Sequence, residues 1–223
     1  MKRREFIAGF GTVAATQLAT IPTFPQSLSR AERPDIKVGD SSVFLDQNVD
    51  TGEKRETRFR VIAVEADKIV IEVAGSTSGT RTFTRDWNLM EVRTGELVSQ
   101  TAKPFWPRLR FPMQVGLKWD SPFEVEVTTR AFMRSAKWQW KAQVAAAESV
   151  AVPAGTFQAF RIEYDASFAT RQGNRSWTGT HKETAWYAPQ AMRIVKRESR
   201  QSVPANKFFE HEVVELLSFM PAQ

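Results

Sequence analysis

Histidine, the side chain that most often holds a metal ion or moves a proton near neutral pH, occurs only twice, as His181 and His211. The stretch from His211 to Glu215 begins like a helical zinc-protease motif, but Glu215 stands where the second histidine is needed. In an extended strand those two residues lie about 13 Å apart, too far to share an ion. The chain has no cysteine. We therefore expect no metal site and no cofactor, and interpret both histidines as surface or rim residues.

Carboxylates offer a second route to chemistry. Glu163 and Asp165 share one face of an expected strand, and Glu183 on the next strand is placed to meet them. Such a group can perform general acid–base catalysis, although carboxylates on a basic β-protein more often pair with arginine across strands. The stretch 75–79, Gly-Ser-Thr-Ser-Gly, has the spacing of a nucleophile elbow, but its centre is threonine and it joins two strands. No residue is assigned a catalytic role.

Aromatic and cationic residues give a clearer pattern. Lys137-Trp-Gln-Trp-Lys141 places two indoles on one face of a strand and two ammonium groups on the other. Indole suits a mixed surface, because it combines a large apolar ring with one hydrogen-bond donor. The hypothesis is an apolar cleft for a lipid chain or a sugar face, with cations that attract phosphates or carboxylates. Its candidate residues are Phe105, Trp106, Arg108, Arg110, Trp138, Trp140 and Lys141. The alternative is that Trp138 and Trp140 fill the core.

The elements that position these residues are strands, because apolar and polar residues alternate with a period of two over much of the chain. The clearest alternation runs from Phe160 to Phe168, and a turn at 171–175 leads into a second strand at 176–187. A last strand is expected at about 208–219. Alternation is typical of antiparallel sheets with one solvated face. The sequence therefore predicts an all-β domain, either an antiparallel β-sandwich or a partly open barrel of about ten or more strands.

Three weak internal echoes indicate two duplicated β-meanders. Residues 38–40 resemble 115–117, residues 61–69 resemble 144–152, and the stretch from Trp87 resembles the stretch from Tyr187. The predicted halves are 37–103 and 113–223. The joint between them is 104–112, where three prolines argue against a helix and against a central strand.

The stretch Val152-Pro-Ala-Gly-Thr-Phe157, followed by an alternating strand and by Trp186-Tyr-Ala-Pro189, resembles a signature of uncharacterised exported bacterial β-domains. Lys37-Val-Gly-Asp40 is similar to their first strand. The resemblance covers most of the mature chain and implies a fold and a compartment. It implies no activity and no catalytic residue. The role of the turn is physical, because proline fixes φ and glycine accepts positive φ ahead of the next strand.

The chain begins with Lys2-Arg-Arg4 and a mildly apolar run from Phe6 to Ile21, which is typical of an export signal and too short and weak for a spanning helix. The arginine pair resembles a twin-arginine signal, and an ordinary secretory signal with a chance pair is the alternative. We expect the signal to occupy 1–31 and a single all-β domain to occupy 32–223. The compartment is then periplasmic or extracellular.

The net charge of the chain limits the classes of partner that the protein is expected to bind. The net charge of the whole chain is +6, but the signal itself carries +3 of it. The remainder is too small for the basic footprint of a nucleic-acid binder. We expect a mature chain without a membrane-spanning segment, and the sequence leaves its oligomeric state open. The preferred hypothesis is a non-enzymatic domain that binds a lipid, a glycan or an envelope protein. The alternatives are an envelope hydrolase that uses Glu163 and Glu183, and an assembly module that pairs through a strand edge.

Overall fold

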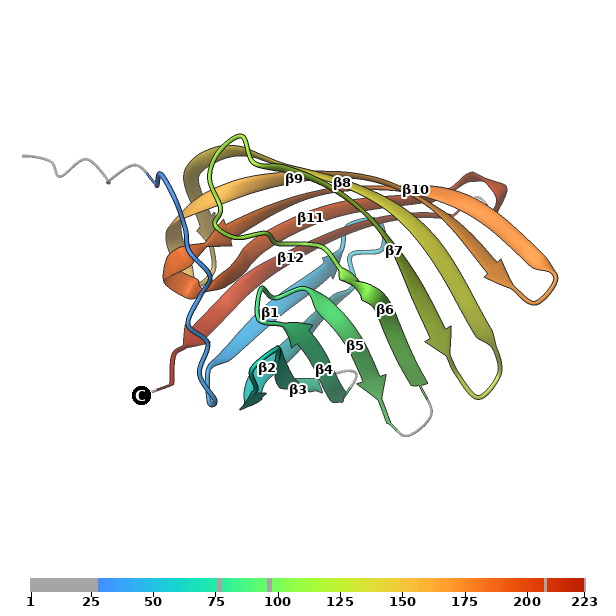
Figure 1. Ribbon diagram of the computed structural model, residues 1–223, viewed down its shortest axis with the longest axis horizontal. Helices are drawn as coiled ribbons and strands as arrows, with labels where there is room; N and C mark the ends of the chain where they lie inside the picture. The colour runs from blue at the N-terminus through green and yellow to red at the C-terminus, as the bar shows by residue number, and fades with distance from the viewer. Residues whose placement is uncertain (1–27, 76–77, 96–97, 207, 223) are drawn as a thin grey trace, which may run out of the picture.

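The computed structural model describes residues 28–75, 78–95, 98–206 and 208–222. The predicted signal and its twin-arginine motif lie outside these residues, except for 28–31. Twelve strands and two short 3-10 helices make up the described part (Figure 1). They are β1 (Ser41–Asn48), β2 (Lys54–Val64), β3 (Lys68–Gly75), β4 (Gly79–Thr84), β5 (Leu89–Thr94), β6 (Val98–Trp106), β7 (Lys118–Thr128), β8 (Met133–Val152), β9 (Gly155–Gln172), β10 (Arg175–Ala188), η1 (Pro189–Ala191), β11 (Arg193–Val203), η2 (Pro204–Asn206) and β12 (Phe208–Met220).

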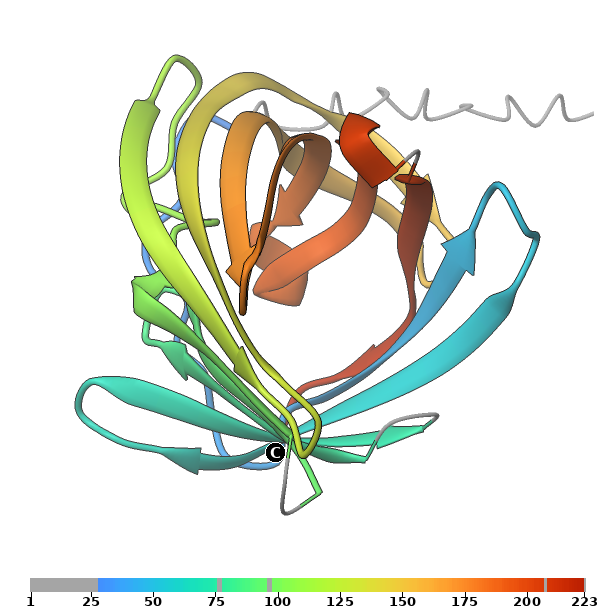
Figure 2. The ribbon, with the colours of Figure 1, turned by 90° about the vertical axis from the view of Figure 1, so that its right-hand side faces the viewer.

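The strands form one closed antiparallel barrel. Each strand pairs with its neighbours along the chain, and β1 pairs with β12 from Ser41–Met220 to Asn48–Glu212 (Figure 2). The all-β prediction is confirmed. The predicted sandwich is wrong. The barrel is closed rather than partly open, because the first and last strands pair with each other and leave no free edge. The assembly hypothesis loses its main support, since every strand of the described chain has a neighbour on both sides.

The two ends of the barrel differ. In a barrel whose strands run up and down in chain order, alternate connections lie at the same end. The turns β1–β2, β7–β8, β9–β10 and β11–β12 lie at one end, which we call the rim end and which faces the viewer in Figure 2. At the other end, the connection from β6 to β7 folds against the interior with Leu109 and Met113 buried. We call this second end the plugged end.

Residues 104–112 are only partly the joint that the sequence predicts. β6 continues through Pro104 to Trp106, and Trp106 pairs with Leu89 of β5. The prolines therefore do not end β6 at residue 103, and the prediction, which excluded a helix and a central strand, is not contradicted. Pro104 is tolerated because the register of β6 with β7 stops at Lys103, so the strand is on an edge at that point. Residues beyond Trp106 leave the sheet.

The hairpin between β8 and β9 extends past the end of β10. β9 pairs with β10 only from Phe160 onward, whereas its pairing with β8 continues to Gly155. At the tip, Gly155 has a φ of +129°, and the amide of Ala154 donates a hydrogen bond of 3.0 Å to the carbonyl of Leu216 in β12. The predicted turn at 153–155 is therefore present, and it joins the hairpin to the far side of the barrel. A second apolar cluster forms there around Leu216.

The same turn geometry occurs in both predicted halves, at the positions that the internal repeat aligns. Gly39 and Gly116 have φ values of +101° and +89°, and each donates a hydrogen bond of 2.9 Å, to the carbonyls of Val61 and Val144 respectively. A register shift in β2 follows Val61, and one in β8 follows Val144. These matches support the duplication, which remains a prediction.

A second recurrence adjusts that alignment. Trp87 and Met192 are the described non-glycine residues with positive φ, at 60° and 56°. Each ends a tight turn with an amide bonded to the carbonyl three residues before it, at 3.0 and 3.1 Å. Trp87 therefore corresponds in geometry to Met192 rather than to Tyr187.

Candidate ligand-binding cavity

One side of the barrel interior is filled by aromatic side chains. The indoles of Trp138 and Trp140 point inward and are 7% and 0% exposed. Trp138 lies 4.4 Å from Phe168 between ring centroids, and Trp106 lies 5.4 Å from Trp138 and 5.6 Å from Trp140. The imidazole of His181 stacks on Trp140 at 5.5 Å. Trp138 and Trp140 thus belong to the barrel core, as the alternative interpretation of the sequence has it.

The opposite side of the interior is hollow. A cavity of about 360 Å³ lies between β1–β5 and β11–β12, within the usual range for a small-molecule site. Its apolar wall includes Phe44, Phe59, Phe83, Trp87 and Trp106. The indole nitrogens of Trp87 and Trp106 are buried without a hydrogen-bond partner in the described protein. The cavity therefore has an aromatic lining, and these two indole nitrogens are covered beside it.

Cations outnumber anions around this cavity. Its lining includes six cationic side chains and two anionic ones, namely Arg55, Arg81, Arg108, Arg193, Lys196 and Arg197 against Asp46 and Glu212. Several cations have acidic partners, since Lys196 is bonded to Glu198 and Glu215, each at 3.3 Å. The excess of cations nevertheless favours an anionic guest.

Two cations of the lining, Arg81 and Arg193, have no such partner among the described residues. The guanidinium of Arg193 instead donates hydrogen bonds to the hydroxyl of Ser42 and the carbonyl of Ala191, which leaves Arg81. The guanidinium of Arg81 lies 5.0 Å from the ring centre of Phe59, and no carboxylate of the described residues lies within 4.0 Å of it. Burial lowers its pKa, the attraction of Asp46 opposes this, and Arg197 and Arg108 lower it further. The carboxylate of Asp46 accepts a hydrogen bond of 2.9 Å from Thr57 instead. Arg81 thus presents to the cavity a positive charge that no ion pair with a described residue neutralises.

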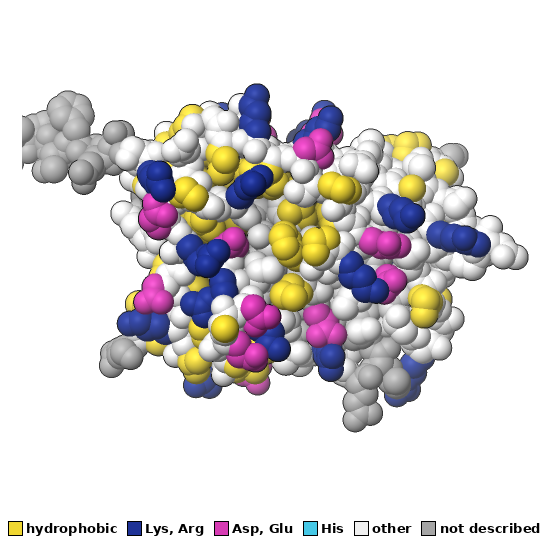
Figure 3. Space-filling view, in the orientation of Figure 1, with side chains coloured by type: hydrophobic (Ala, Val, Ile, Leu, Met, Phe, Trp, Pro, Cys, Tyr) yellow, Lys and Arg dark blue, Asp and Glu magenta, His cyan; other side chains and the backbone are white. Residues whose placement is uncertain are grey.

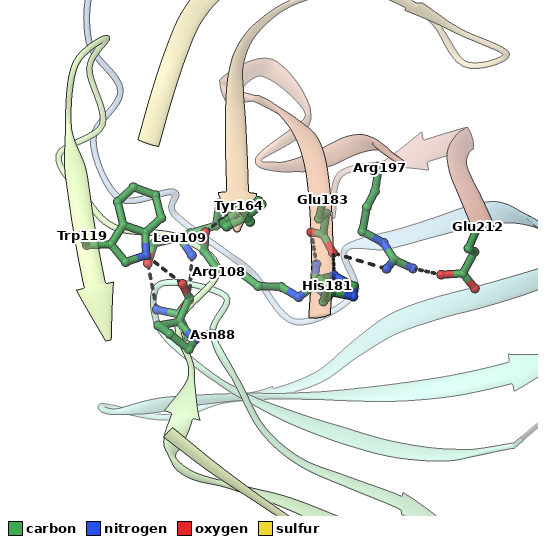
Figure 4. A network of polar contacts seen from close by, with 10 residues as sticks. Asn88, Arg108, Leu109, Trp119, Tyr164, His181, Glu183, Arg197 and Glu212 are labelled. Carbon is green, nitrogen blue, oxygen red and sulfur yellow. Dashed lines mark hydrogen bonds and ion pairs between the residues drawn. The ribbon is translucent and has the colours of Figure 1, made fainter. Parts of the chain in front are cut away.

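A buried polar network separates the cavity from the aromatic core (Figure 4). The carboxylate of Glu183 lies 2.5 Å from Arg108 and 3.6 Å from Arg197, and Arg197 also bonds Glu212 at 2.5 Å. His181 bonds Glu183 at 3.2 Å. Burial would raise the pKa of Glu183, but Arg108, the hydrogen bond of His181 and Arg197 outweigh it and lower that pKa to about 2. Glu183 is therefore ionised and fixes two cationic side chains at the edge of the cavity.

The segment from Pro107 to Leu109 is held inside the barrel by side chains from three elements (Figure 4). The amide of Asn88 donates to the carbonyl of Leu109 at 2.9 Å and accepts from its N–H at 2.8 Å. The indole of Trp119 donates a hydrogen bond of 2.8 Å to the backbone carbonyl of Pro107. The hydroxyl of Tyr164 donates one of 2.6 Å to the backbone carbonyl of Arg108. This segment is consequently a fixed floor for the cavity.

The structure separates the predicted binding residues into groups. Trp106 and Arg108 line the cavity, whereas Trp138 and Trp140 lie in the core beside it. Lys141 projects from the outer face of β8, where it lines a groove with Lys118 and Asp165, and does not reach the interior. Phe105 and Arg110 are not among the cavity-lining residues. Successive residues of a strand point to opposite faces of the sheet, so Trp140 faces the interior of the barrel and Lys141 faces outward.

The group of three carboxylates considered as an alternative, catalytic site is not assembled. Glu183 pairs with Tyr164 across β10 and β9 and faces inward, whereas Glu163 and Asp165 face outward. The pairing of Glu163 with Glu183 is therefore wrong by one position in register. His181 is also misplaced in the sequence interpretation, because it is buried and not a rim residue. No group of three or more potential metal ligands occurs among the described residues.

Sequence reasoning missed Arg81, Arg193 and Arg197. Arg81 occurs in the strand Thr80-Arg-Thr-Phe83, in phase with the inward-facing Phe83. A cation that shares the phase of apolar residues was a usable signal for the interior of a barrel. For Arg193 and Arg197 the signal was weaker, because a register shift between β10 and β11 disrupts the alternation.

No protein-family model matches the sequence, and no curated protein does so either. Among solved structures, the chain is similar to a Bacteroides fragilis protein described as exported and of YmcC-like fold, with a TM-score of 0.53 and 16% identity over 85% of this chain and 99% of that one. A Parabacteroides distasonis protein described as a lipoprotein matches at 0.44 and 15% over 87% and 100%. The hypothetical lipoprotein YmcC of Escherichia coli matches at 0.48 and 12% over 82% and 85%. The first likeness shows a shared fold.

Proposed function

We propose that the protein is a non-enzymatic binding domain of the bacterial envelope whose barrel holds a small amphiphile with an anionic head group. Arg81 carries the proposal, because a partly buried guanidinium with no carboxylate within 4.0 Å among the described residues is costly unless a ligand compensates it. The aromatic wall suits the apolar body of such a ligand.

The envelope location rests on two supports. Residues 1–31 have the character of an export signal, and the Bacteroides fragilis protein that shares the fold is described as exported. The described residues contain no helix that is both long and apolar enough to cross a membrane. A bound lipid or glycolipid acid would be available to the protein in that compartment.

Two probes with the same chain and different charge test the proposal. cis-Parinaric acid and its methyl ester are each titrated into the protein, and binding is followed by their fluorescence. The ester keeps the chain of the acid and lacks its charge. We expect the acid to bind more tightly than the ester, and Arg81→Gln to remove about a tenfold or larger part of that preference, because one hydrogen bond to a charged group is worth about 1.5–3 kcal/mol. The control is Arg58→Gln, an exposed arginine on the outer face of β2.

Native mass spectrometry of protein purified from its own host identifies the natural guest. An added mass that is lost on denaturation and reduced in Arg81→Gln supports the proposal. A bare polypeptide mass, together with equal binding of the acid and the ester, overturns it.

A further inference from the structure

Two hairpin tips at the rim end, on either side of the β9–β10 tip, expose large apolar side chains. Phe132 and Met133 lie at the tip between β7 and β8, and they are 38% and 68% exposed. Phe208 and Phe209 begin β12, next to the turn after β11, and are 43% and 69% exposed. The β9–β10 tip lies between these two in strand order. Four of the nine described large apolar residues that are strongly exposed thus gather on this part of the rim.

The tip between β7 and β8 holds its apolar residues in a defined turn. The hydroxyl of Thr129 accepts hydrogen bonds from the amides of Ala131 and Phe132, each at 3.1 Å. The amide of Thr129 donates in turn to the carbonyl of Phe132 at 2.9 Å. Phe132 and Met133 are therefore presented outward by a closed hydrogen-bonded turn.

The same tips are cationic. Arg130 and Arg134 flank the β7–β8 tip, and Arg171 and Arg175 flank the β9–β10 tip. None of these four has a carboxylate within 4.0 Å in the described part of the chain. Across the described residues of the three tips one acidic side chain occurs, Glu210. On the barrel wall, by contrast, acidic and basic side chains are intermixed (Figure 3).

We propose that this part of the rim binds the surface of an anionic lipid bilayer, with Phe132, Met133, Phe208 and Phe209 inserted among the head groups and the four arginines on lipid phosphates. Aromatic and other apolar side chains next to cations are the combination that interfacial membrane binding requires. The positive charge of the tips favours an anionic bilayer over a neutral one, because the four guanidiniums have no carboxylate partner among the described residues. The β1–β2 tip at the same end has Asp50 and Glu53 beside Lys54 and Arg55, and so lacks this excess of positive charge.

The position of the rim relates this surface to the cavity. Arg55 and Glu212 line the cavity and lie near the rim ends of β2 and β12, so the cavity extends toward that end. Binding of the rim to a bilayer would bring the cavity close to lipid. The membrane proposal stands apart from the identity of any cavity ligand, because none of its residues lines the cavity.

Co-sedimentation of the mature protein with vesicles tests the inference. We expect binding to vesicles of mixed phosphatidylglycerol and phosphatidylcholine, much weaker binding to phosphatidylcholine alone, and a decrease as salt rises. The double variant Arg171→Gln/Arg175→Gln should lose about a fivefold factor in partitioning per charge. The variant Met133→Ser/Phe209→Ser should lose most of the binding while keeping the urea midpoint of the wild type.

Matched controls lie elsewhere on the surface. Arg58→Gln/Arg60→Gln removes two exposed cations from the wall of β2, and Met220→Ser removes an apolar residue, 63% exposed, from the plugged end. Both should bind vesicles like the wild type, and so should Arg81→Gln, which separates this inference from the cavity ligand. Absence of binding to anionic vesicles, or an equal loss in the controls, overturns the inference. So does self-association without lipid that the rim variants abolish, because the rim would then bind a second copy.

Discussion

Replacement of Glu183 by glutamine tests the buried network that fixes Arg108 and Arg197. The variant keeps the shape of the side chain and removes its negative charge. Glu183 is 3% exposed and forms ion pairs with both arginines. Removal of one partner from a buried ion pair typically costs about 3–5 kcal/mol. Because glutamine still accepts one hydrogen bond and Arg197 keeps Glu212, we expect the lower end of that range at neutral pH.

The pH dependence gives a second magnitude. The network lowers the pKa of Glu183 from 4.5 to about 2. Stability from a depressed carboxyl pKa is fully present above the unfolded value and is lost as the pH falls toward the folded one. A difference of about 2.5 pKa values corresponds to about 3 kcal/mol in total, of which about 2 kcal/mol is lost by pH 3.

Urea unfolding at a series of pH values measures both quantities. The wild type and Glu183→Gln are compared between about pH 7 and pH 3, and the difference between them should shrink by about 2 kcal/mol over that interval. Glu163→Gln is the control, because this outward-facing carboxylate is half exposed in its ion pair with Arg161 and should cost less than about 1 kcal/mol. A difference that stays constant with pH would refute the argument, since Glu183 would then not be held ionised by its neighbours.

Three further predictions concern the floor, the core and the start of the domain. Asn88→Ala should destabilise the protein by about 2–4 kcal/mol in urea, because it leaves both backbone groups of Leu109 buried without partners, and a cost below about 1 kcal/mol would contradict this. Trp140→Ala should cost about 3–5 kcal/mol in the same assay, and unchanged cis-parinaric acid binding at a temperature where it stays folded would assign Trp140 to the core alone. A chain that begins at Glu32 should be about 2 kcal/mol less stable than one that begins at Leu28, because it loses both backbone hydrogen bonds of Ala31 with Met113; equal stability would favour a signal that ends at residue 31.

Local pattern was enough for the strands of the second half of the chain. The alternation from Phe160 to Phe168 lies within β9, the predicted strand at 176–187 lies within β10, and the last strand corresponds to β12. The turn at 171–175 is also present, with Gly173 at a φ of +55°. These features depend on residues adjacent in sequence, and a period of two reports them directly.

The candidate site was only half visible in the sequence. Trp106 and Arg108 were identified from the density of aromatic and cationic residues, and both line the cavity. Lys141 was grouped with them although it faces outward, because proximity along a strand does not specify the side of the sheet. Arg81 was missed, since a single arginine in a strand resembles a solvated residue until the wall closes around it.

The sequence by itself determined that the described chain is built of antiparallel strands, where several of them begin and end, and which residues share a face. Tertiary structure alone decided that β1 meets β12, that Glu183 turns inward and Glu163 outward, and that Arg81 lies beside Arg108 and Arg197. The physical reason is range. Alternation is a local property of the backbone, whereas closure of the sheet and the register of each pair depend on contacts between residues far apart in the chain.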